Sequence, residues 1–252
     1  MNIGTKKSLI LLLIFCCIIS PNVFSQRKIS FVASDNLIVT ADLYLLDKSN
    51  PYIILLHQEN SSRGEYRDIA PRLQKLGFNC IAVDLRYGKE SNFIQNETAS
   101  QAQKAGIQVT AIDCEKDILA AIDYISKTTT KNKYILLGSS FSASLALKIA
   151  NHNRYATAAI AFSPGEYFGP LNLLKNWVKD YDKLVYTAVT TREYPFTKDL
   201  LVSIPQDKLT LFKPSSGEGV HGAPALWNDN PTSNEYWMSL MMFIKKVKET
   251  EY

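Results

Sequence analysis

Residues 134–144 read YILLGSSFSAS, and this stretch decides how the rest of the chain is interpreted. An apolar strand ends at Gly138, a serine follows two residues later, and a helical pattern begins at once. This is the layout of a nucleophile elbow, a sharp strand-to-helix turn that exposes a serine hydroxyl. Such a turn crowds the backbone, so the positions two before and two after the serine should carry almost no side chain.

The crowding identifies Ser140 as the candidate nucleophile. Around it, the two crowded positions hold a glycine and Ser142, although a second glycine is more usual at the latter. Around Ser139 they would hold Leu137 and Phe141, which are too large. The elbow alone is weak evidence, because small residues between a buried strand and a helix are also common packing devices.

The first 25 residues have the pattern of a secretory signal peptide. Two lysines precede an apolar run over residues 9–19, which is too short to span a bilayer comfortably. Small or β-branched residues follow at Val23 and Ser25. We therefore expect cleavage after Ser25 and export of residues 26–252 to the periplasm or the medium, with no membrane association afterwards. A retained membrane anchor is the less favoured alternative.

The expected mature chain is almost neutral and forms one domain. Cleavage takes two lysines and no acid from the 28 basic and 24 acidic residues, which leaves a net charge of +2. No basic run with interleaved aromatic residues occurs, so nucleic acid is not an expected partner. The remaining length suffices for a single α/β domain, residues 26–252, with a substantial core.

Cysteine and histidine usage gives no sign of a metal site. Cys80 falls in an expected strand and Cys114 on an expected helix, so neither lies in a loop suited to a disulfide. An oxidising compartment would allow a bridge between them, but two separate buried thiols are the expectation. There is no C-x-x-C pair and no histidine cluster of ligand spacing, so the sequence predicts neither a metal nor another cofactor.

Strands and helices are expected to alternate along the chain. Apolar or alternating patterns predict strands at 28–33, 37–45, 52–57, 78–83, 133–137, 156–162, 183–189 and 208–212. Helical spacing predicts helices at 64–76, 106–126, 140–151 and 235–248. Residues 86–104 are polar and irregular. This order implies parallel β-α-β units in one doubly wound sheet, whose ligands lie beyond the carboxyl ends of the strands, where Ser140 falls.

Four segments carry a family resemblance in a fixed order. They are LLHQEN (55–60), VDLRYG (83–88), the elbow and GVHG (219–222). In this order and spacing the chain resembles the α/β-hydrolase superfamily, and closely its small, nearly lidless dienelactone-hydrolase-like branch, over most of residues 28–249. The resemblance implies an α/β-hydrolase fold, with a mostly parallel sheet, helices on both faces and a minimal cap. It also implies a serine hydrolase that requires no cofactor.

His221 is the expected general base. A serine hydroxyl is a poor nucleophile near neutral pH, and an imidazole that accepts its proton is the usual remedy. Of the three histidines, only His221 lies in a glycine-flanked loop after the last strand. His57 matches a position that shapes the oxyanion loop in the resembled family, whereas His152 ends the elbow helix and is expected to be solvated or capping.

The acid that orients the histidine is placed by the resemblance after the strand at 183–189. Glu193 is the first choice, with a surface role beside Arg192 as its alternative. Glu166, after the preceding strand, is the second choice, because some members of the family take the acid from there. Asp199 is the third.

Two backbone N–H groups should stabilise the oxyanion. Phe141 follows the nucleophile directly at a helix start, so its amide is the first expected donor. The second should come from the loop after His57, either from Gln58 or from Glu59. Gln58 stands where the family usually has glycine, and Glu59 is favoured by its offset from His57.

Other conspicuous residues have expected structural roles. Asp84 and Arg86 should tie loops together at the strand ends. The aromatic and aliphatic side chains of residues 163–182 could form a small cap helix over an acyl pocket, but a helix packed on the sheet is the more common outcome. The segment is too short for a large lid, so the site should be open.

The sequence therefore predicts an exported serine hydrolase that cleaves small-molecule carboxylic esters, with amides as alternative substrates. Ser140 would attack the carbonyl carbon and carry the acyl group. His221 would move the proton, and Glu193 would orient the imidazole. The amides of Phe141 and Glu59 would hold the oxyanion.

A non-catalytic binding module with the same fold is the alternative hypothesis. It is favoured by Gln58 and Ser142, which replace two glycines usual in the family, and by the open choice of the acid. Covalent labelling of Ser140 by a fluorophosphonate would reject it.

Overall fold

The computed structural model describes residues 25–129 and 133–251. The expected signal peptide, apart from Ser25, lies outside these residues. In the part of the chain that is described, no helix combines the length and the apolar character of a membrane span. In that same part, no three histidine, cysteine, aspartate or glutamate side chains are grouped so that they could hold a metal ion.

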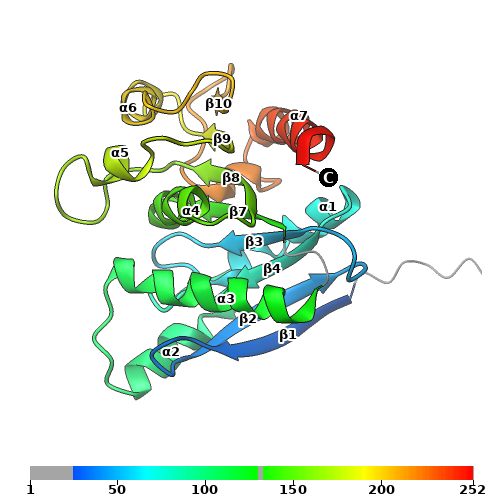
Figure 1. The fold of residues 1–252 in the computed structure, drawn as a ribbon, viewed down its shortest axis with the longest axis vertical. Coiled ribbons are helices and arrows are strands. Elements are labelled where there is room, and N and C mark those ends of the chain that lie inside the picture. The colour runs from blue at the N-terminus through cyan, green and yellow to red at the C-terminus, as the bar shows by residue number, and fades with distance from the viewer. Residues whose placement is uncertain (1–24, 130–132, 252) are drawn as a thin grey trace, which may run out of the picture.

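An eight-stranded sheet forms the centre of the molecule (Figure 1). Its strands are β1 (Ser25–Val32), β2 (Ile38–Leu45), β3 (Tyr52–Leu56), β4 (Asn79–Val83), β7 (Tyr134–Ser139), β8 (Ala156–Phe162), β9 (Leu184–Ala188) and β10 (Leu209–Phe212). The spatial order is β1-β2-β4-β3-β7-β8-β9-β10. The β1–β2 and β2–β4 pairs are antiparallel, and the others are parallel. The expected mostly parallel, doubly wound sheet is confirmed.

Helices cover both faces of this sheet, as expected. They include α1 (Ala70–Lys75), α3 (Cys114–Thr128), α4 (Phe141–His152) and α7 (Ser233–Glu251). One apolar cluster, with Ile118 and Leu145, packs under α3 and α4, which lie on the near face in Figure 1. A second cluster, with Leu73 and Phe243, packs under α1 and α7 on the other face. Strands β3, β4 and β7–β9 are buried throughout because both of their faces are covered.

Two predicted helices begin later than expected. The stretch 64–76 divides into a single 3₁₀ turn, η1 (Arg63–Tyr66), and α1, whose first turn contains Pro71. Proline suits that position because its missing N–H would have no partner there. Helix α3 begins at Cys114, eight residues after the expected start at 106, because a capping box between Thr110 and Asp113 starts the helical conformation there.

Three short helices and a small hairpin complete the fold. These are α2 (Glu97–Lys104), α5 (Leu173–Trp177), α6 (Tyr194–Leu200) and the β5 (Glu90–Ser91)–β6 (Ile94–Gln95) pair. Helix α2 lies in a region expected to be irregular. Only Thr98 and Ala102 of α2 are buried, so it has no apolar periodicity, but the Asn96 side chain accepts the Ala99 N–H at 2.8 Å and caps it.

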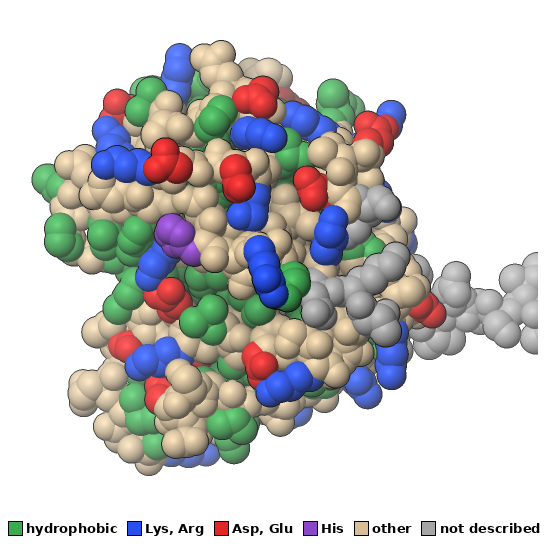
Figure 2. All heavy atoms as spheres, in the orientation of Figure 1, with side chains coloured by type: hydrophobic (Ala, Val, Ile, Leu, Met, Phe, Trp, Pro, Cys, Tyr) green, Lys and Arg blue, Asp and Glu red, His purple; other side chains and the backbone are tan. Residues whose placement is uncertain are grey.

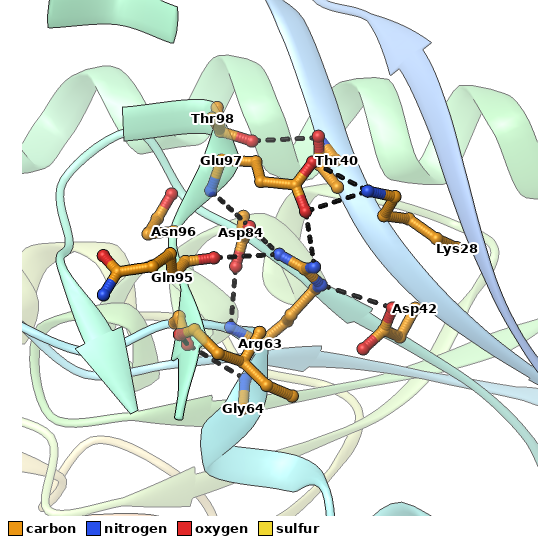
Figure 3. A network of polar contacts seen from close by, with 12 residues as sticks. Lys28, Thr40, Asp42, Arg63, Gly64, Asp84, Gln95, Asn96, Glu97 and Thr98 are labelled. Atoms are coloured by element: carbon orange, nitrogen blue, oxygen red, sulfur yellow. Dashed lines mark hydrogen bonds and ion pairs between the residues drawn. The ribbon is translucent and has the colours of Figure 1, made fainter. Parts of the chain in front are cut away.

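Arg63 joins four segments beside the carboxyl end of β4 (Figure 3). Its guanidinium group contacts Asp84 after β4 at 2.5 Å, Asp42 of β2 at 3.2 Å and Glu97 of α2 at 2.7 Å. The Asp84 carboxylate also accepts the backbone N–H groups of Arg63 and Glu97, each at 2.8 Å. Because Arg63 and Asp84 are buried, this cluster anchors the loop that follows β3 to its neighbours.

Arg86 forms a second buried cluster, with Asp117 at 2.8 Å and Asp35 at 2.5 Å. Asp84 and Arg86 therefore tie loops at the strand ends, as expected. Cys80 and Cys114 are both buried and unpaired, which confirms the expectation of separate thiols.

Candidate active site

The register of β3 and β7 brings two loops together at the carboxyl edge of the sheet. Leu56, the last residue of β3, pairs with Gly138 of β7. Residues 57–59 and 140–141 therefore leave the sheet beside one another. The elbow and the loop that is expected to hold the oxyanion are thus neighbours as a result of strand pairing alone.

Ser140 has the backbone conformation that a nucleophile elbow requires. Its φ is 58° and its ψ is −123°, and a non-glycine residue in such a region costs about 1–3 kcal/mol. A Cβ atom on Gly138 would lie 2.6 Å from the Ala143 Cα, so no side chain fits there. The Ser140 N–H donates to the Phe162 carbonyl of β8 at 2.8 Å and fixes the turn.

Ser142, which replaces the second glycine, is accommodated by hydrogen bonds. Its hydroxyl accepts the Ser139 N–H at 2.9 Å and donates to the Leu56 carbonyl at 2.7 Å. The extra side chain therefore joins the elbow to the end of β3. The departure from the family pattern leaves the turn intact.

The structure brings Ser140, His221 and Glu193 together. His221 Nε2 lies 2.9 Å from Ser140 Oγ, and His221 Nδ1 lies 2.5 Å from Glu193 Oε1. With Nδ1–H donating to the carboxylate, Nε2 is the nitrogen that can accept a proton from the serine. The His221 side chain is 43 % exposed, so a ligand can reach this edge from solvent.

Glu193 is held by the same contacts that start α6. Its N–H donates to Thr190 Oγ1 at 3.2 Å, while its Oε2 accepts the Thr190 N–H at 3.0 Å, which forms a capping box. The Ser163 hydroxyl donates to the same oxygen at 2.8 Å. One carboxylate oxygen is thereby fixed, and the other faces His221.

The charge of Glu193 follows from these contacts. Partial burial opposes ionisation, but hydrogen bonds from His221, the Thr190 amide and Ser163 outweigh it and lower the pKa of Glu193 to about 2. Glu193 therefore carries a negative charge at neutral pH.

The other two acids considered from the sequence have different partners. Glu166 accepts the backbone N–H groups of Leu174 at 2.9 Å and Lys175 at 3.3 Å, at the start of α5. Asp199 pairs with the Lys175 ammonium group at 2.6 Å. Neither acid contacts His221.

Ser163 was not anticipated from the sequence. It has a φ of 52°, and its hydroxyl donates to Glu193 and accepts the Gly222 N–H at 3.1 Å, which links the acid to the loop of His221. The only sequence signal is its place directly after β8. Tyr167 was also missed. Its hydroxyl donates to the Ser163 carbonyl at 3.1 Å and interacts with Ser140.

His57 orients the peptide bond between Gln58 and Glu59. His57 is fully buried; its Nε2 accepts the Leu85 N–H at 2.9 Å and its Nδ1 donates to the Gln58 carbonyl at 2.7 Å. Burial lowers the pKa of His57 to about 4, which keeps the ring neutral. Because the peptide is trans, its N–H, which belongs to Glu59, points away from the buried His57.

The two candidate oxyanion donors of this loop differ in their contacts. The Gln58 N–H donates to Glu65 Oε2 at 3.1 Å and is therefore occupied. The Glu59 N–H has no acceptor among the residues that the structure describes. The Phe141 N–H, in the first turn of α4, belongs to the amides that no helical carbonyl can pair. This geometry favours Glu59 over Gln58 as the partner of Phe141.

Two cavities lie beside these residues. One of 790 Å³ has Glu59 and Tyr87 in its wall, and another of 460 Å³ has Tyr167, Glu193 and Phe196. The outline of the molecule is indented on the left of Figure 2, between the levels of α5 and the start of α3. Helix α5 itself packs on the apolar cluster under α4 through the buried Leu174, as the sequence led us to expect.

A family model described as the alpha/beta hydrolase fold matches residues 51–249. The chain belongs to the α/β-hydrolase fold family. This confirms the resemblance seen in the sequence and accounts for the sheet, the elbow and the loop of His221 as parts of one fold. A comparison with curated protein sequences gave no significant match.

Solved structures of this family are similar to the chain in fold. An esterase from Pyrococcus furiosus, Pf2001, has a TM-score of 0.63 at 15 % identity, covering 88 % of this chain and 90 % of its own. A dienelactone hydrolase from Anabaena variabilis has a TM-score of 0.62 at 14 % identity, over 87 % and 95 %. Est1E from Butyrivibrio proteoclasticus has a TM-score of 0.61 at 15 % identity, over 86 % and 98 %.

Proposed function

We propose that this α/β-hydrolase-fold protein is a serine hydrolase that cleaves carboxylic esters of small molecules. The observation that carries the proposal is the continuous chain of hydrogen bonds from Ser140 through His221 to Glu193. A hydroxyl, an imidazole and an ionised carboxylate in this order activate a serine for attack on a carbonyl carbon. The esterase and dienelactone hydrolase among the similar structures support an ester as substrate.

Ser140, His221 and Glu193 each have a role in acyl transfer. His221 Nε2 takes the Ser140 proton while Oγ attacks the ester carbonyl, and Glu193 stabilises the imidazolium that forms. The tetrahedral intermediate collapses when His221 gives that proton to the leaving alcohol, which leaves an ester on Ser140. Water, deprotonated by His221, then releases the acid and restores the serine.

The oxyanion would be held by the N–H groups of Phe141 and Glu59. Donors that are already aimed at the developing charge need no reorganisation during the reaction, and losing one typically costs about 10²- to 10³-fold in turnover. A cavity with Glu59 in its wall and another with Glu193 in its wall would give room for the groups on either side of the ester carbonyl.

A fluorophosphonate probe tests the proposal directly. We expect one covalent adduct on the wild-type protein, assigned to Ser140 by peptide mass spectrometry, because the probe reacts with activated serines. Ser144, a buried serine of α4 that bonds to Gly165, offers a matched control: Ser144→Ala should still be labelled. A wild type that takes up no probe would support the non-catalytic binding module instead.

We also propose that the chain is exported after cleavage behind Ser25. Residue 25 is the first of β1, so processing there removes the apolar segment and leaves the sheet with its edge strand. We expect the secreted or periplasmic protein to begin at or near Gln26 when its intact mass is measured. Retention of Met1, or a lipid on Cys16 or Cys17, would contradict this processing.

A further inference from the structure

Glu65 is a buried acid that the proposed reaction does not use. It lies in η1 with none of its surface exposed. Its Oε2 accepts the Gln58 N–H at 3.1 Å, and its buried Oε1 has no hydrogen-bond partner among the residues that the structure describes. In the described part of the chain, no lysine or arginine side chain forms an ion pair with it.

Gln58 is held from three directions. The Glu65 carboxyl group accepts the Gln58 N–H, and His57 Nδ1 donates to the Gln58 carbonyl oxygen. On the third side, the Gln58 side chain reaches the loop of His221, where a Cβ atom on Gly222 would lie 2.8 Å from Gln58 Oε1. Two hydrogen bonds therefore oppose rotation of the peptide that follows Gln58, and its side chain lies against the loop of His221.

We propose that Glu65 is a positioning residue of the esterase site: by holding the Gln58 N–H inward, its carboxyl group aims the Glu59 N–H at the oxyanion. The inference rests on the proposed function, since an oxyanion forms only if Ser140 attacks a carbonyl carbon. This role accounts for an acid at position 65, because burying a carboxyl group costs free energy that burying an apolar side chain of similar size does not.

The carboxyl group can do this in either charge state. Burial raises the pKa of Glu65 to about 7, although the nearby Ser139 and Ser61 hydroxyl groups, the Gln58 amide and His221 work in the opposite direction. The titratable groups that face it are His221, from the loop after β10, and Tyr66, its neighbour in η1. An acceptor oxygen remains available to the Gln58 N–H whether or not the acid is protonated.

Two substitutions separate positioning from packing. Glu65→Leu removes the acceptor at similar volume, whereas Glu65→Gln keeps an acceptor oxygen and removes the charge. Gln74→Leu, another buried polar residue changed to leucine, is the matched control on α1, away from the site.

With a short-chain aryl ester, Glu65→Leu should lower kcat by about 10²- to 10³-fold, the loss typical of one oxyanion donor, with little change in KM. The rate of labelling by the fluorophosphonate should fall by a similar factor. Glu65→Gln should recover kcat to within about tenfold of the wild type, and Gln74→Leu should match the wild type. Full kcat in Glu65→Leu, or a Glu65→Gln variant as slow as Glu65→Leu, would overturn the inference.

A second measurement does not depend on turnover or on the folding of Glu65→Leu. In the wild type, the Gln58 amide proton resonance should shift with pH around 7 as Glu65 ionises, and in Glu65→Gln this titration should vanish. A Gln58 amide proton resonance that is the same in Glu65→Gln as in the wild type across this pH range would overturn the role of Glu65. A wild type that shows this titration but neither hydrolyses esters nor takes up the probe would refute the esterase proposal and leave the contact established.

Discussion

Ser140→Ala is expected to lower kcat for a short-chain aryl ester by roughly 10⁴- to 10⁶-fold, because no other hydroxyl can form the acyl-enzyme. The fold should be unaffected. The substitution removes a single oxygen at the surface edge of the elbow, and alanine has the same backbone limits as serine at a φ of 58°. Steady-state hydrolysis measures the change in kcat, and a thermal unfolding curve measures whether the fold is retained.

The register of the elbow is tested by neighbouring serines. Ser144→Ala should retain turnover, because the Ser144 hydroxyl hydrogen-bonds to the Gly165 backbone and lies inside α4. If Ser140→Ala remained active and Ser139→Ala were the inactive variant, the nucleophile would have been assigned one residue too late.

Glu193→Gln should reduce kcat by about 10³- to 10⁴-fold while the protein remains folded. The amide keeps the shape but removes the charge that stabilises the imidazolium and selects its tautomer. Glu166→Gln is the matched control, because Glu166 bonds to the first turn of α5 and not to His221. A crippled Glu166→Gln beside an unaffected Glu193→Gln would place the acid after β8, and full activity in both would indicate a Ser–His dyad.

The pH dependence follows from the low pKa of Glu193. Its folded pKa, about 2, lies below its ordinary value of 4.5, so the ionised form stabilises the fold above pH 4.5 and this contribution is lost as pH falls toward 2. In the wild type, Glu193 should therefore add no inflection to kcat/KM above about pH 4. An ionisation in that range that disappears in Glu193→Gln would contradict the assignment.

The elbow could be predicted because its signal is local, and Glu193 because the family resemblance places the acid after the strand at 183–189. A strand, a glycine two residues ahead of a serine and an immediate helix specify Ser140, since a side chain at Gly138 has no space. Glu193 follows a recognisable strand at a short distance, and a strand end can be assigned to the carboxyl edge without coordinates.

Ser163 could not be predicted because its partners are distant in the sequence, and Glu65 could not because its burial has no local signal. Ser163 contacts Glu193 and Gly222 across intervals of 30 and 59 residues, and these contacts arise only when the ends of β8, β9 and β10 meet. Nothing in the composition around Glu65 separates it from a surface acid.

The fold was predictable except where polar sequence folds without an apolar stripe. Helix α2 buries little, so its capping residue Asn96 was its only signal. The capping box at Thr110 and Asp113 is a local signal that places the start of the helical conformation at residue 111, whereas the predicted start at 106 lies before the first apolar position of the helix, Ala111.

The Arg63 cluster sets how independently the oxyanion loop can open. Local opening of the segment after β3 would separate the buried Arg63 guanidinium group from the carboxylate of Asp84. Leaving one buried charge of such a pair without its partner costs about 3–5 kcal/mol. That is a large fraction of the stability of an ordinary domain. Segments with such a penalty exchange their amide protons near the rate of global unfolding rather than through local fraying. We therefore expect the backbone of this loop to open only together with the sheet, as one cooperative unit.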